Sequence, residues 1–170
     1  RGPFDGSSVP KYIDYYHITS IYLTGQPSLS TYNSHSIHMN LTSQKEVKAL
    51  IKEHEIRLKK SLGQNFLVSQ GVVENILKAA NLQSTDTVVE IGPGIGTLTI
   101  PLAAKVKKVI AIEKDKKMVG ILQEMTKDIP NITIIHGDAL HDPPTLPATY
   151  KVVANLPYYI TSPVIRSFLE

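Results

Sequence analysis

Apolar residues after residue 39 recur with the spacing of short helices and strands. Val47, Leu50 and Ile51 share one face of a helix with a period of 3.6 residues. Ser43 stands before them, and Glu46 follows it three residues later, which is the pattern of a capping box at a helix N-terminus. The sequence therefore predicts a short amphipathic helix that begins just after Ser43.

The polar side of this predicted helix is basic. Lys45, Lys48 and Lys52 lie on it, and Lys59 and Lys60 follow it. Two interpretations are open: an ordinary solvated helix face, which is the more common case, or a strip that faces RNA phosphates.

Residues 69–170 alternate between helices and strands. Ser69 is a plausible N-cap for a helix over 70–80. Pro163 suits the N1 position of a final helix, with Ser162 as its cap. The pattern between them predicts strands at 87–91, 106–112, 131–135 and 150–154, and helices at 97–105 and 116–126. This order predicts an α/β fold, a parallel sheet with right-handed crossovers and helices on both faces.

The first 38 residues differ from the rest in composition. They contain five of the eight tyrosines, and their charges cancel, so the whole net charge of +3 lies after residue 38. Met39 then precedes the first predicted helix. We expect residues 1–38 to be a leader or an appended extension, with a genuine N-terminal extension as the alternative, and residues 39–170 to form the domain. Residues 12–23 are rich in β-forming side chains that favour a strand.

Composition excludes several classes of protein. Hydrophobic residues make up 42% and charged residues 19%, which are globular values. There is no cysteine, so disulfides, thiolate metal sites and a cysteine nucleophile are excluded. No stretch approaches the roughly 20 apolar residues of a membrane span, and no secretory signal pattern opens the chain. We expect a soluble, cytoplasmic protein, and its small basic excess is compatible with an RNA partner.

A glycine-rich turn after the strand at 87–91 is the strongest local feature. Gly92, Gly94 and Gly96 let the backbone approach a ligand closely, and the helix that follows presents free N–H groups. Glu113 ends the next strand, where a carboxylate can accept from both hydroxyls of a ribose. The pair indicates a nucleoside-containing cofactor, and the G-x-G-x-G spacing favours S-adenosylmethionine over NAD. A purely structural tight turn is the alternative.

Asp138 follows the third predicted strand, before Ala139. Its carboxylate is expected at the same end of the sheet, where it can accept from the amino group of the cofactor's adenine. Aspartate is also a common turn residue, so the ligand role is favoured only because Gly92 and Glu113 point to the same crevice.

The run Asn155-Leu156-Pro157-Tyr158 at the end of the fourth strand indicates the reaction class. An amino group on a base is a poor nucleophile because its lone pair is delocalised into the ring. The side-chain oxygen of Asn155 and a backbone carbonyl of the following turn can hold its two hydrogens. Pro157 fixes the turn, and Tyr158 offers a face for a flipped-out base. The alternative is a proline-terminated strand with an aromatic lid, and Tyr159 is either a second stacking wall or a core residue.

Four strings in the chain, KKSLGQNFL, VVEIGPGIGTLT, GDAL and NLPYYITSPVI, resemble the ribosomal RNA adenine dimethyltransferases, relatives of the erythromycin-resistance methyltransferases. The resemblance covers about residues 43–170, in order. It implies a Rossmann-like S-adenosylmethionine-dependent methyltransferase fold. It also implies N6-dimethylation of two neighbouring adenosines near the 3′ end of small-subunit ribosomal RNA.

The resemblance also implies site residues. Asn65 and Leu67 would contact the cofactor, together with residues of the turns described above, and Asn155 with Tyr158 would engage the target adenine. The expected cofactor-binding set is Asn65, Leu67, Gly92, Gly94, Gly96, Glu113, Asp138, Ala139 and Asn155, and the expected catalytic set is Asn155, Leu156, Pro157 and Tyr158.

The chain departs from the family pattern in two places. Most relatives have NLPYNI where this chain has NLPYYI, so Tyr159 replaces an asparagine, which is expected to alter the base pocket without removing the acceptor at Asn155. The chain also ends inside the helix after the fourth strand, where the family continues with more strands and a small helical domain. We therefore expect a sheet that is incomplete at the C-terminus, with an exposed edge. Residues 12–23 are a candidate to cover that edge, within one chain or between the two chains of a homodimer.

The expected reaction is in-line methyl transfer to adenine N6 that depends on positioning rather than on a covalent nucleophile. His136 and His141 flank Asp138 and Asp142 on a loop, and we expect no metal site there. Two alternatives from other classes remain. One is a truncated, non-catalytic module that at most binds cofactor. The other is an NAD-dependent dehydrogenase, which the glycine spacing and the Asn-Leu-Pro-Tyr run disfavour.

Overall fold

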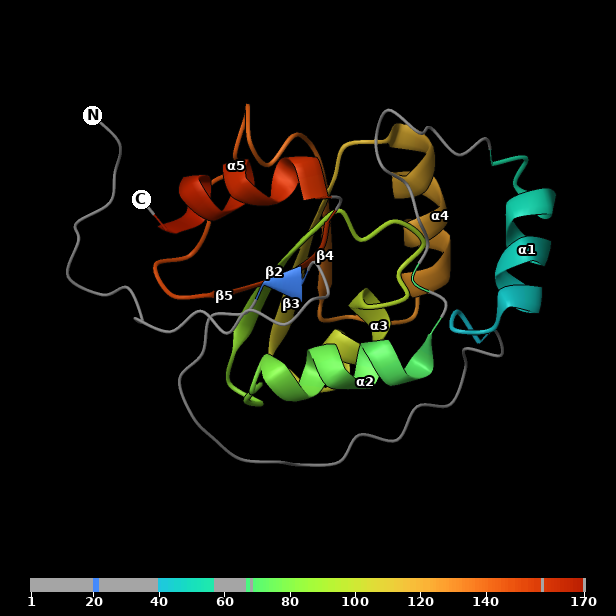
Figure 1. The fold of residues 1–170 in the computed structure, drawn as a ribbon, viewed down its shortest axis with the longest axis horizontal. Helices are drawn as coiled ribbons and strands as arrows, with labels where there is room; N and C mark the ends of the chain where they lie inside the picture. Colours follow the sequence, from blue (N-terminus) through green and yellow to red (C-terminus); the bar gives the residue numbers. More distant parts are fainter. Residues whose placement is uncertain (1–19, 22–39, 57–66, 68, 157, 170) are drawn as a thin grey trace.

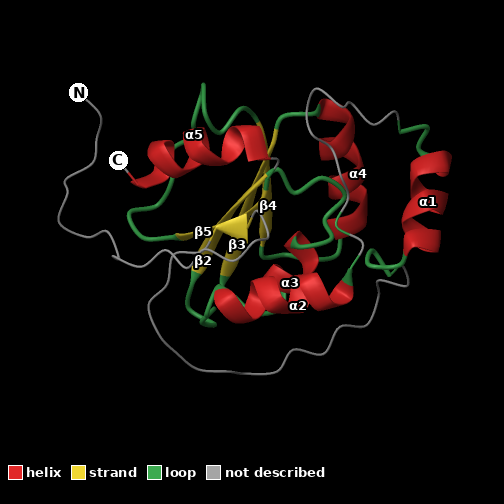
Figure 2. Cartoon of the chain, in the orientation of Figure 1, coloured by secondary structure: helices red, strands yellow, loops and turns green. Residues whose placement is uncertain are grey.

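The computed structural model describes residues 20–21, 40–56, 67, 69–156 and 158–169, which form five helices and five strands (Figures 1 and 2). In chain order the elements are β1 (Ser20–Ile21), α1 (Gln44–Glu53), α2 (Gln70–Ala79), β2 (Thr87–Ile91), α3 (Thr99–Ala103), β3 (Lys108–Glu113), α4 (Lys116–Thr126), β4 (Ile132–His136), β5 (Lys151–Asn155) and α5 (Tyr158–Leu169). Among these residues, no helix combines the length and the apolar character that a bilayer span requires.

The five strands form one sheet in the order β1-β5-β2-β3-β4. The four longer strands run parallel, with Val89 opposite Ile110 on one side and opposite Val152 on the other. β1 pairs antiparallel with the outer edge of β5, so that Ser20 lies opposite Asn155. The expected parallel sheet is confirmed, and the tyrosine-rich segment covers its edge at Ser20–Ile21 within the same chain. The rest of residues 12–23 lies outside the described residues, and pairing between two chains stays a prediction.

Helices cover both faces of the sheet, as expected (Figures 1 and 2). Alternate strand residues point to opposite faces. Val88, Val109 and Val153 pack in one core cluster with residues of α2 and α3. The alternate residues of the same strands, such as Val89 and Ile110, pack on the other face with Val164 of α5. The strands β2, β3 and β5 are thus buried on both sides, which explains why they are almost continuously apolar.

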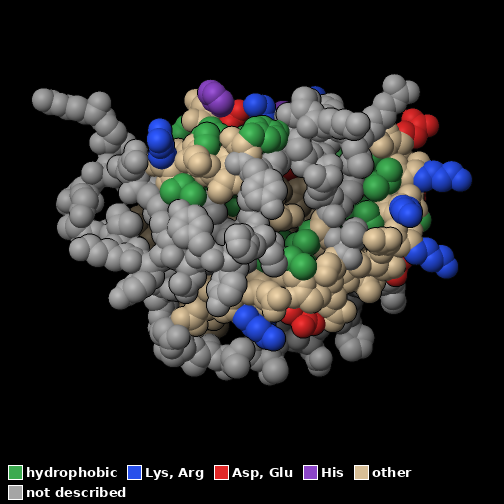
Figure 3. All heavy atoms as spheres, in the orientation of Figure 1, with side chains coloured by type: hydrophobic (Ala, Val, Ile, Leu, Met, Phe, Trp, Pro, Cys, Tyr) green, Lys and Arg blue, Asp and Glu red, His purple; other side chains and the backbone are tan. Residues whose placement is uncertain are grey.

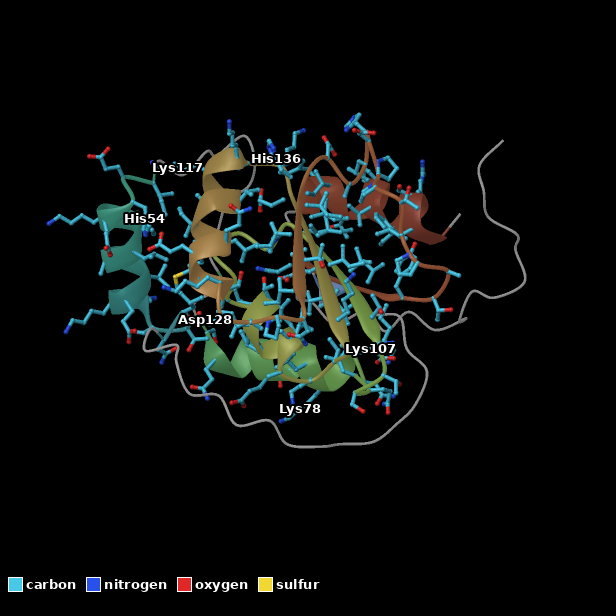
Figure 4. All side chains as sticks on the ribbon, turned by 180° about the vertical axis from the view of Figure 1, so that it is seen from behind. His54, Lys78, Lys107, Lys117, Asp128 and His136 are labelled. Carbon is cyan, nitrogen blue, oxygen red and sulfur yellow. The ribbon has the colours of Figure 1, made fainter. Side chains whose placement is uncertain are left out.

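Helix α1 packs against α4 rather than against the sheet (Figure 4). Its capping box forms in part, because the Ser43 hydroxyl accepts from the N–H of Glu46 while the Glu46 carboxylate accepts from the N–H of Asn40. The Lys117 Nζ atom of α4 donates to the carbonyl oxygen of Glu55 at 2.7 Å, just beyond the end of α1. The apolar side chains that share this contact are Leu41, Val47, Leu50, Ile56, Ile95, Met118 and Ile121.

The basic strip on α1 is exposed. Lys45, Lys48 and Lys52 all have exposed side chains, and Figure 3 shows lysine or arginine side chains projecting from this end of the molecule. Lys59 and Lys60 lie outside the described residues. Both interpretations of the strip remain predictions.

The last helix was predicted to begin in the wrong place. α5 begins at Tyr158, not at Pro163, which lies inside the helix. The reason is its apolar stripe: Ile160, Val164 and Phe168 recur every four residues and pack on the sheet, so the helix must include the turn before Pro163. The bounds of the other predicted elements over 70–155 agree to within two residues. Ser69 is the N-cap of α2, but its side chain makes no capping hydrogen bond.

Candidate functional site

A cavity of about 270 Å³ lies at the carboxyl ends of the parallel strands. The chain runs from β2 outward to β3 and β4 and then crosses back to β5 on the other side of β2. This reversal opens a crevice beside the end of β2, where parallel α/β sheets bind ligands. The sequence-predicted residues that line the cavity are Leu67, Gly92, Gly94, Glu113, Asp138, Ala139, Asn155 and Leu156.

The glycine-rich turn between β2 and α3 forms one wall of the cavity. Gly92, Gly94 and Gly96 have φ angles of +67°, +58° and +93°, a region that side-chain-bearing residues rarely adopt. Among the described residues other than its chain neighbours, a Cβ atom on Gly92 would meet one atom within 4 Å, Leu156 Cδ2 at 3.9 Å. Gly96 does not line the cavity: a Cβ atom there would lie 2.9 Å from Leu122 Cδ1 of α4. Gly92 and Gly94 therefore border the ligand space, whereas Gly96 allows α4 to pack closely.

Glu113 holds this turn in place. Its Oε2 atom accepts from the N–H of Gly94 at 3.1 Å, and its Oε1 atom accepts from the N–H of Asp115 at 2.8 Å. Burial raises the pKa of Glu113, and the backbone N–H groups of Asp115 and Gly94 oppose that rise. A carboxylate oxygen can accept more than one hydrogen bond, so both oxygens of Glu113 retain acceptor capacity toward the cavity that it lines.

A second carboxylic acid, Glu90, lies within the sheet beneath the cavity. Its side chain is 2% exposed, and its Oε2 atom has no hydrogen-bond partner among the described residues. Burial raises the pKa of Glu90 to about 8; the Thr99 hydroxyl opposes this rise and the charge of Glu113 adds to it. The hydroxyl of Thr97, which also lines the cavity, is likewise without a partner in the described part of the chain. The cavity thus holds buried polar atoms that a polar ligand can satisfy.

Asp138 lies at the rim of the cavity in a polar cluster. Its Oδ2 atom is 2.7 Å from Lys114 Nζ and 3.0 Å from His141 Nδ1, and its Oδ1 atom accepts from the N–H of Leu140 at 3.0 Å. The Lys114 ammonium group, more than any other neighbour, holds the pKa of the Asp138 carboxyl well below its usual range. Asp138 is therefore ionised at neutral pH and presents an acceptor at the rim.

Asn155 ends β5 beside this space. Its side chain is half-buried, and Leu156 after it is buried. The cavity is thus lined from the ends of three neighbouring strands, by Gly92 after β2, Glu113 of β3 and Asn155 of β5. Tyr158 begins α5, and Asn65 and Pro157 lie outside the described residues.

Sequence reasoning missed several residues of the cavity. Glu90, Thr97, Lys114 and His141 line it without having been predicted. Glu90 gave a signal, because it is an acid inside the apolar run Val-Val-Glu-Ile. The other three gave none. Within the described residues, no group of three or more histidine, cysteine, aspartate or glutamate side chains is arranged to hold a metal ion.

The sheet order, the glycine-rich turn and the carboxylate at the end of the next strand define a Rossmann-like methyltransferase fold, the class expected from the sequence. The family model described as ribosomal RNA adenine dimethylase matches residues 55–170. The chain therefore belongs to the ribosomal RNA adenine dimethylase family, whose cofactor is S-adenosylmethionine. The dehydrogenase alternative is thereby removed.

Similar proteins agree with this assignment. The chain is 50% identical over 131 residues to ribosomal RNA small subunit methyltransferase A of Dehalococcoides mccartyi, a match that covers 74% of the chain and 44% of that protein. Solved structures match it as well. A dimethyladenosine transferase from Plasmodium falciparum is 33% identical with a TM-score of 0.52, covering 59% of this chain and 37% of that one. The 23S rRNA methyltransferase ErmE is 34% identical with a TM-score of 0.56, covering 62% and 43%. The chain spans a little under half the length of the curated relatives it matches.

Proposed function

We propose that this chain contains the S-adenosylmethionine-binding part of an enzyme that dimethylates adenosines of small-subunit ribosomal RNA at N6. The observation that carries the proposal is the meeting of Gly92, Glu113 and Asn155, from the ends of three adjacent parallel strands, around one cavity. The names of the relatives, which are methyltransferases and dimethylases of ribosomal RNA, support the same activity and substrate. The proposed partner is therefore the small ribosomal subunit, and the cytoplasmic location stays a prediction.

The cavity fits the cofactor in chemical terms. Gly92 and Gly94 leave room where other residues would place a side chain, and Glu113 offers carboxylate oxygens suited to two ribose hydroxyls. The ionised Asp138 offers an acceptor to the amino group of an adenine. The unpartnered oxygen of Glu90 offers a hydrogen-bonding partner to a polar group of the ligand. We assign cofactor binding to Asn65, Leu67, Gly92, Gly94, Glu113, Asp138, Ala139 and Asn155, and we assign Gly96 to the packing that holds the turn.

The proposed mechanism rests on holding the target amino group. When bound, the cofactor supplies an electrophilic methyl group. The two hydrogens of adenine N6 donate hydrogen bonds to the side-chain oxygen of Asn155 and to a backbone carbonyl between Leu156 and Pro157. This arrangement directs the nitrogen lone pair away from the ring. Tyr158 stacks on the flipped-out base. These groups contribute orientation, and the excess proton passes to solvent.

Isothermal titration of S-adenosylmethionine into the chain, with Glu113→Gln and Asn155→Ala variants, tests the cofactor assignment. We expect saturable binding by the unaltered chain and at least tenfold weaker binding by Glu113→Gln. Circular dichroism of each variant separates a lost ligand contact from a lost fold, because Glu113 also holds the turn. Ser167→Ala, an exposed position on α5, is the matched control and is expected to bind normally.

Methyl transfer is tested separately. The chain is incubated with cofactor and the small ribosomal subunit from a strain that lacks dimethyladenosine, and the RNA is analysed by mass spectrometry. We expect dimethyladenosine with the unaltered chain and none with Asn155→Ala. Cofactor binding without methylation would leave the alternative of a non-catalytic module, and a folded chain without cofactor binding would contradict the proposal as a whole.

A further inference from the structure

Tyr159 lies at the rim of the cofactor cavity. Among the described residues, Tyr159 is the large hydrophobic residue that is mostly exposed, with 59% of its surface accessible. It also lines the cavity. A ring that is both exposed and part of the lining lies at the mouth rather than in the interior. The core role that the sequence left open for Tyr159 is therefore wrong.

Tyr159 shares a face of α5 with other exposed residues. Ser162, Pro163 and Arg166 lie three, four and seven positions after it, which is the spacing of one helix face, and all three are exposed. The opposite face of α5 packs on the sheet through Val164. We call Tyr159, Ser162, Pro163 and Arg166 the α5 face.

The α5 face has the chemistry of a single-stranded nucleic-acid surface. An exposed tyrosine ring offers a plane on which a base stacks, and an arginine guanidinium pairs with phosphate through two hydrogen bonds. Arg166 is the one charged side chain within α5, so no carboxylate of this helix opposes a polyanion. At 1.5 Å per residue, Tyr159 and Arg166 lie about 10 Å apart along the helix axis. The aromatic end meets the cavity and the cationic end points away from it.

We propose that the α5 face binds the single-stranded RNA that enters the site, with a base stacked on Tyr159 beside the adenosine in the cavity and a phosphate on Arg166. This inference rests on the proposed function, because the cavity gives the α5 face its role. It adds a second base contact and the path of the RNA along α5 away from the cavity. Tyr159 thereby becomes a residue that selects an unpaired base next to the modified one.

Fluorescence anisotropy with a labelled, unstructured RNA hexamer that contains two adjacent adenosines tests the inference, in the presence of S-adenosylhomocysteine. We expect Tyr159→Ala to weaken binding about 5-fold to 100-fold, the range for loss of one base stack, and Tyr159→Phe to bind nearly normally. Arg166→Gln is expected to weaken binding several-fold and to lower the slope of log affinity against log salt by about one. A second hexamer carries one adenosine with an abasic site next to it, so it offers no neighbouring base to Tyr159. The unaltered chain and Tyr159→Ala are expected to bind this hexamer with equal affinity.

The matched charge control is Lys107→Gln, an exposed position at the end of the sheet away from α5 (Figure 4). It is expected to change RNA affinity less than twofold. The inference is overturned if Tyr159→Ala binds RNA as tightly as the unaltered chain, or if Tyr159→Phe loses as much affinity as Tyr159→Ala. It is also overturned if Lys107→Gln loses as much affinity as Arg166→Gln, or if the unaltered chain binds no RNA. Cofactor titration of the same samples separates the two proposals. Normal cofactor binding with unchanged RNA affinity removes only this inference, whereas absent cofactor binding removes the proposed function.

Discussion

The Lys151 Nζ atom lies 2.8 Å from Asp86 Oδ2, and it also donates to the carbonyl oxygen of Asn81 at 2.6 Å. The two charged side chains are only 10% and 18% exposed. This contact ties the start of β5 to the loop before β2, at the end of the sheet opposite the cavity. It therefore fixes the two strands that carry Asn155 and the glycine-rich turn against each other.

Loss of this ion pair is expected to destabilise the fold. We predict that Lys151→Met lowers the free energy of unfolding by about 1–3 kcal/mol, because Asp86 and the Asn81 carbonyl lose a buried partner. Urea denaturation measures the effect, and Lys107→Met, an exposed lysine, is the control with an expected change within about 0.5 kcal/mol. Equal losses in the two variants would show that the contact is not stabilising.

The buried acid Glu90 is expected to make stability depend on pH. Its pKa in the folded chain is about 8, above the ordinary value of 4.5, so the folded state binds a proton that the unfolded state releases. Its contribution is thus complete below about pH 4.5 and is lost as pH rises through 8. We predict that the unfolding free energy of the unaltered chain falls between pH 5 and pH 8 relative to Glu90→Gln, with a slope approaching about 1.4 kcal/mol per pH unit.

Urea denaturation at each pH provides this comparison. Glu53→Gln serves as the control, because Glu53 is an exposed residue at the end of α1. The difference between the unaltered chain and this control variant is expected to stay constant with pH. A similarly constant difference for Glu90→Gln would mean that Glu90 is ionised in the folded chain.

Two glycines are expected to respond in opposite directions to alanine. Gly96 has a φ of +93°, and a Cβ atom there would lie 2.9 Å from Leu122 Cδ1, so we predict that Gly96→Ala destabilises by about 1–3 kcal/mol. Gly120 lies inside α4, and among the described residues outside its own turn of helix no atom lies within 4 Å of the added Cβ, so Gly120→Ala should stabilise by about 0.4–1 kcal/mol. Thermal unfolding distinguishes the two, and a stabilised Gly96→Ala variant would refute the account of the turn.

Asn131 joins the loop after α3 to the start of β4. Its Nδ2 atom donates to the carbonyl oxygens of Ala103 at 2.8 Å and Val106 at 3.0 Å. We predict that Asn131→Asp destabilises more than Asn131→Ala at pH 7, because a carboxylate would face two acceptors without a hydrogen to donate. The difference in unfolding free energy between the two variants, measured by urea denaturation, is expected to become smaller below about pH 4, where aspartate is protonated. If the two variants are equally stable at pH 7, the amide does not act as this double donor.

Sequence reasoning succeeded where local periodicity and turn chemistry determine the structure. The bounds of β2 and α4 were predicted to the residue, since both are strongly patterned and α4 has the capping residue Asp115. The strands β3 and β5 were predicted to end at 112 and 154, one residue before their observed ends at Glu113 and Asn155. The convergence of these strands on one cavity then followed from the parallel order.

The failures have a common physical origin in contacts between distant parts of the chain. The start of α5 was predicted from the local preference of Pro163, but the packing of Ile160 on the sheet decided it. The ion pair of Lys114 with Asp138 depends on side-chain positions at the ends of two strands, which no spacing reveals. The pairing of Ser20 with Asn155 is a register between distant segments, and only its possibility was visible in the composition.

The position of β2 between β3 and β5 has a consequence for the newly made chain. β3 follows β2 closely during synthesis, whereas β5 appears only on the order of sixty residues later, which at roughly 5–20 residues per second takes several seconds. During that interval the apolar edge formed by Val88 to Ile91 has no neighbour on one side. The nascent protein is therefore most open to pairing with other chains just before β5 emerges from the ribosome.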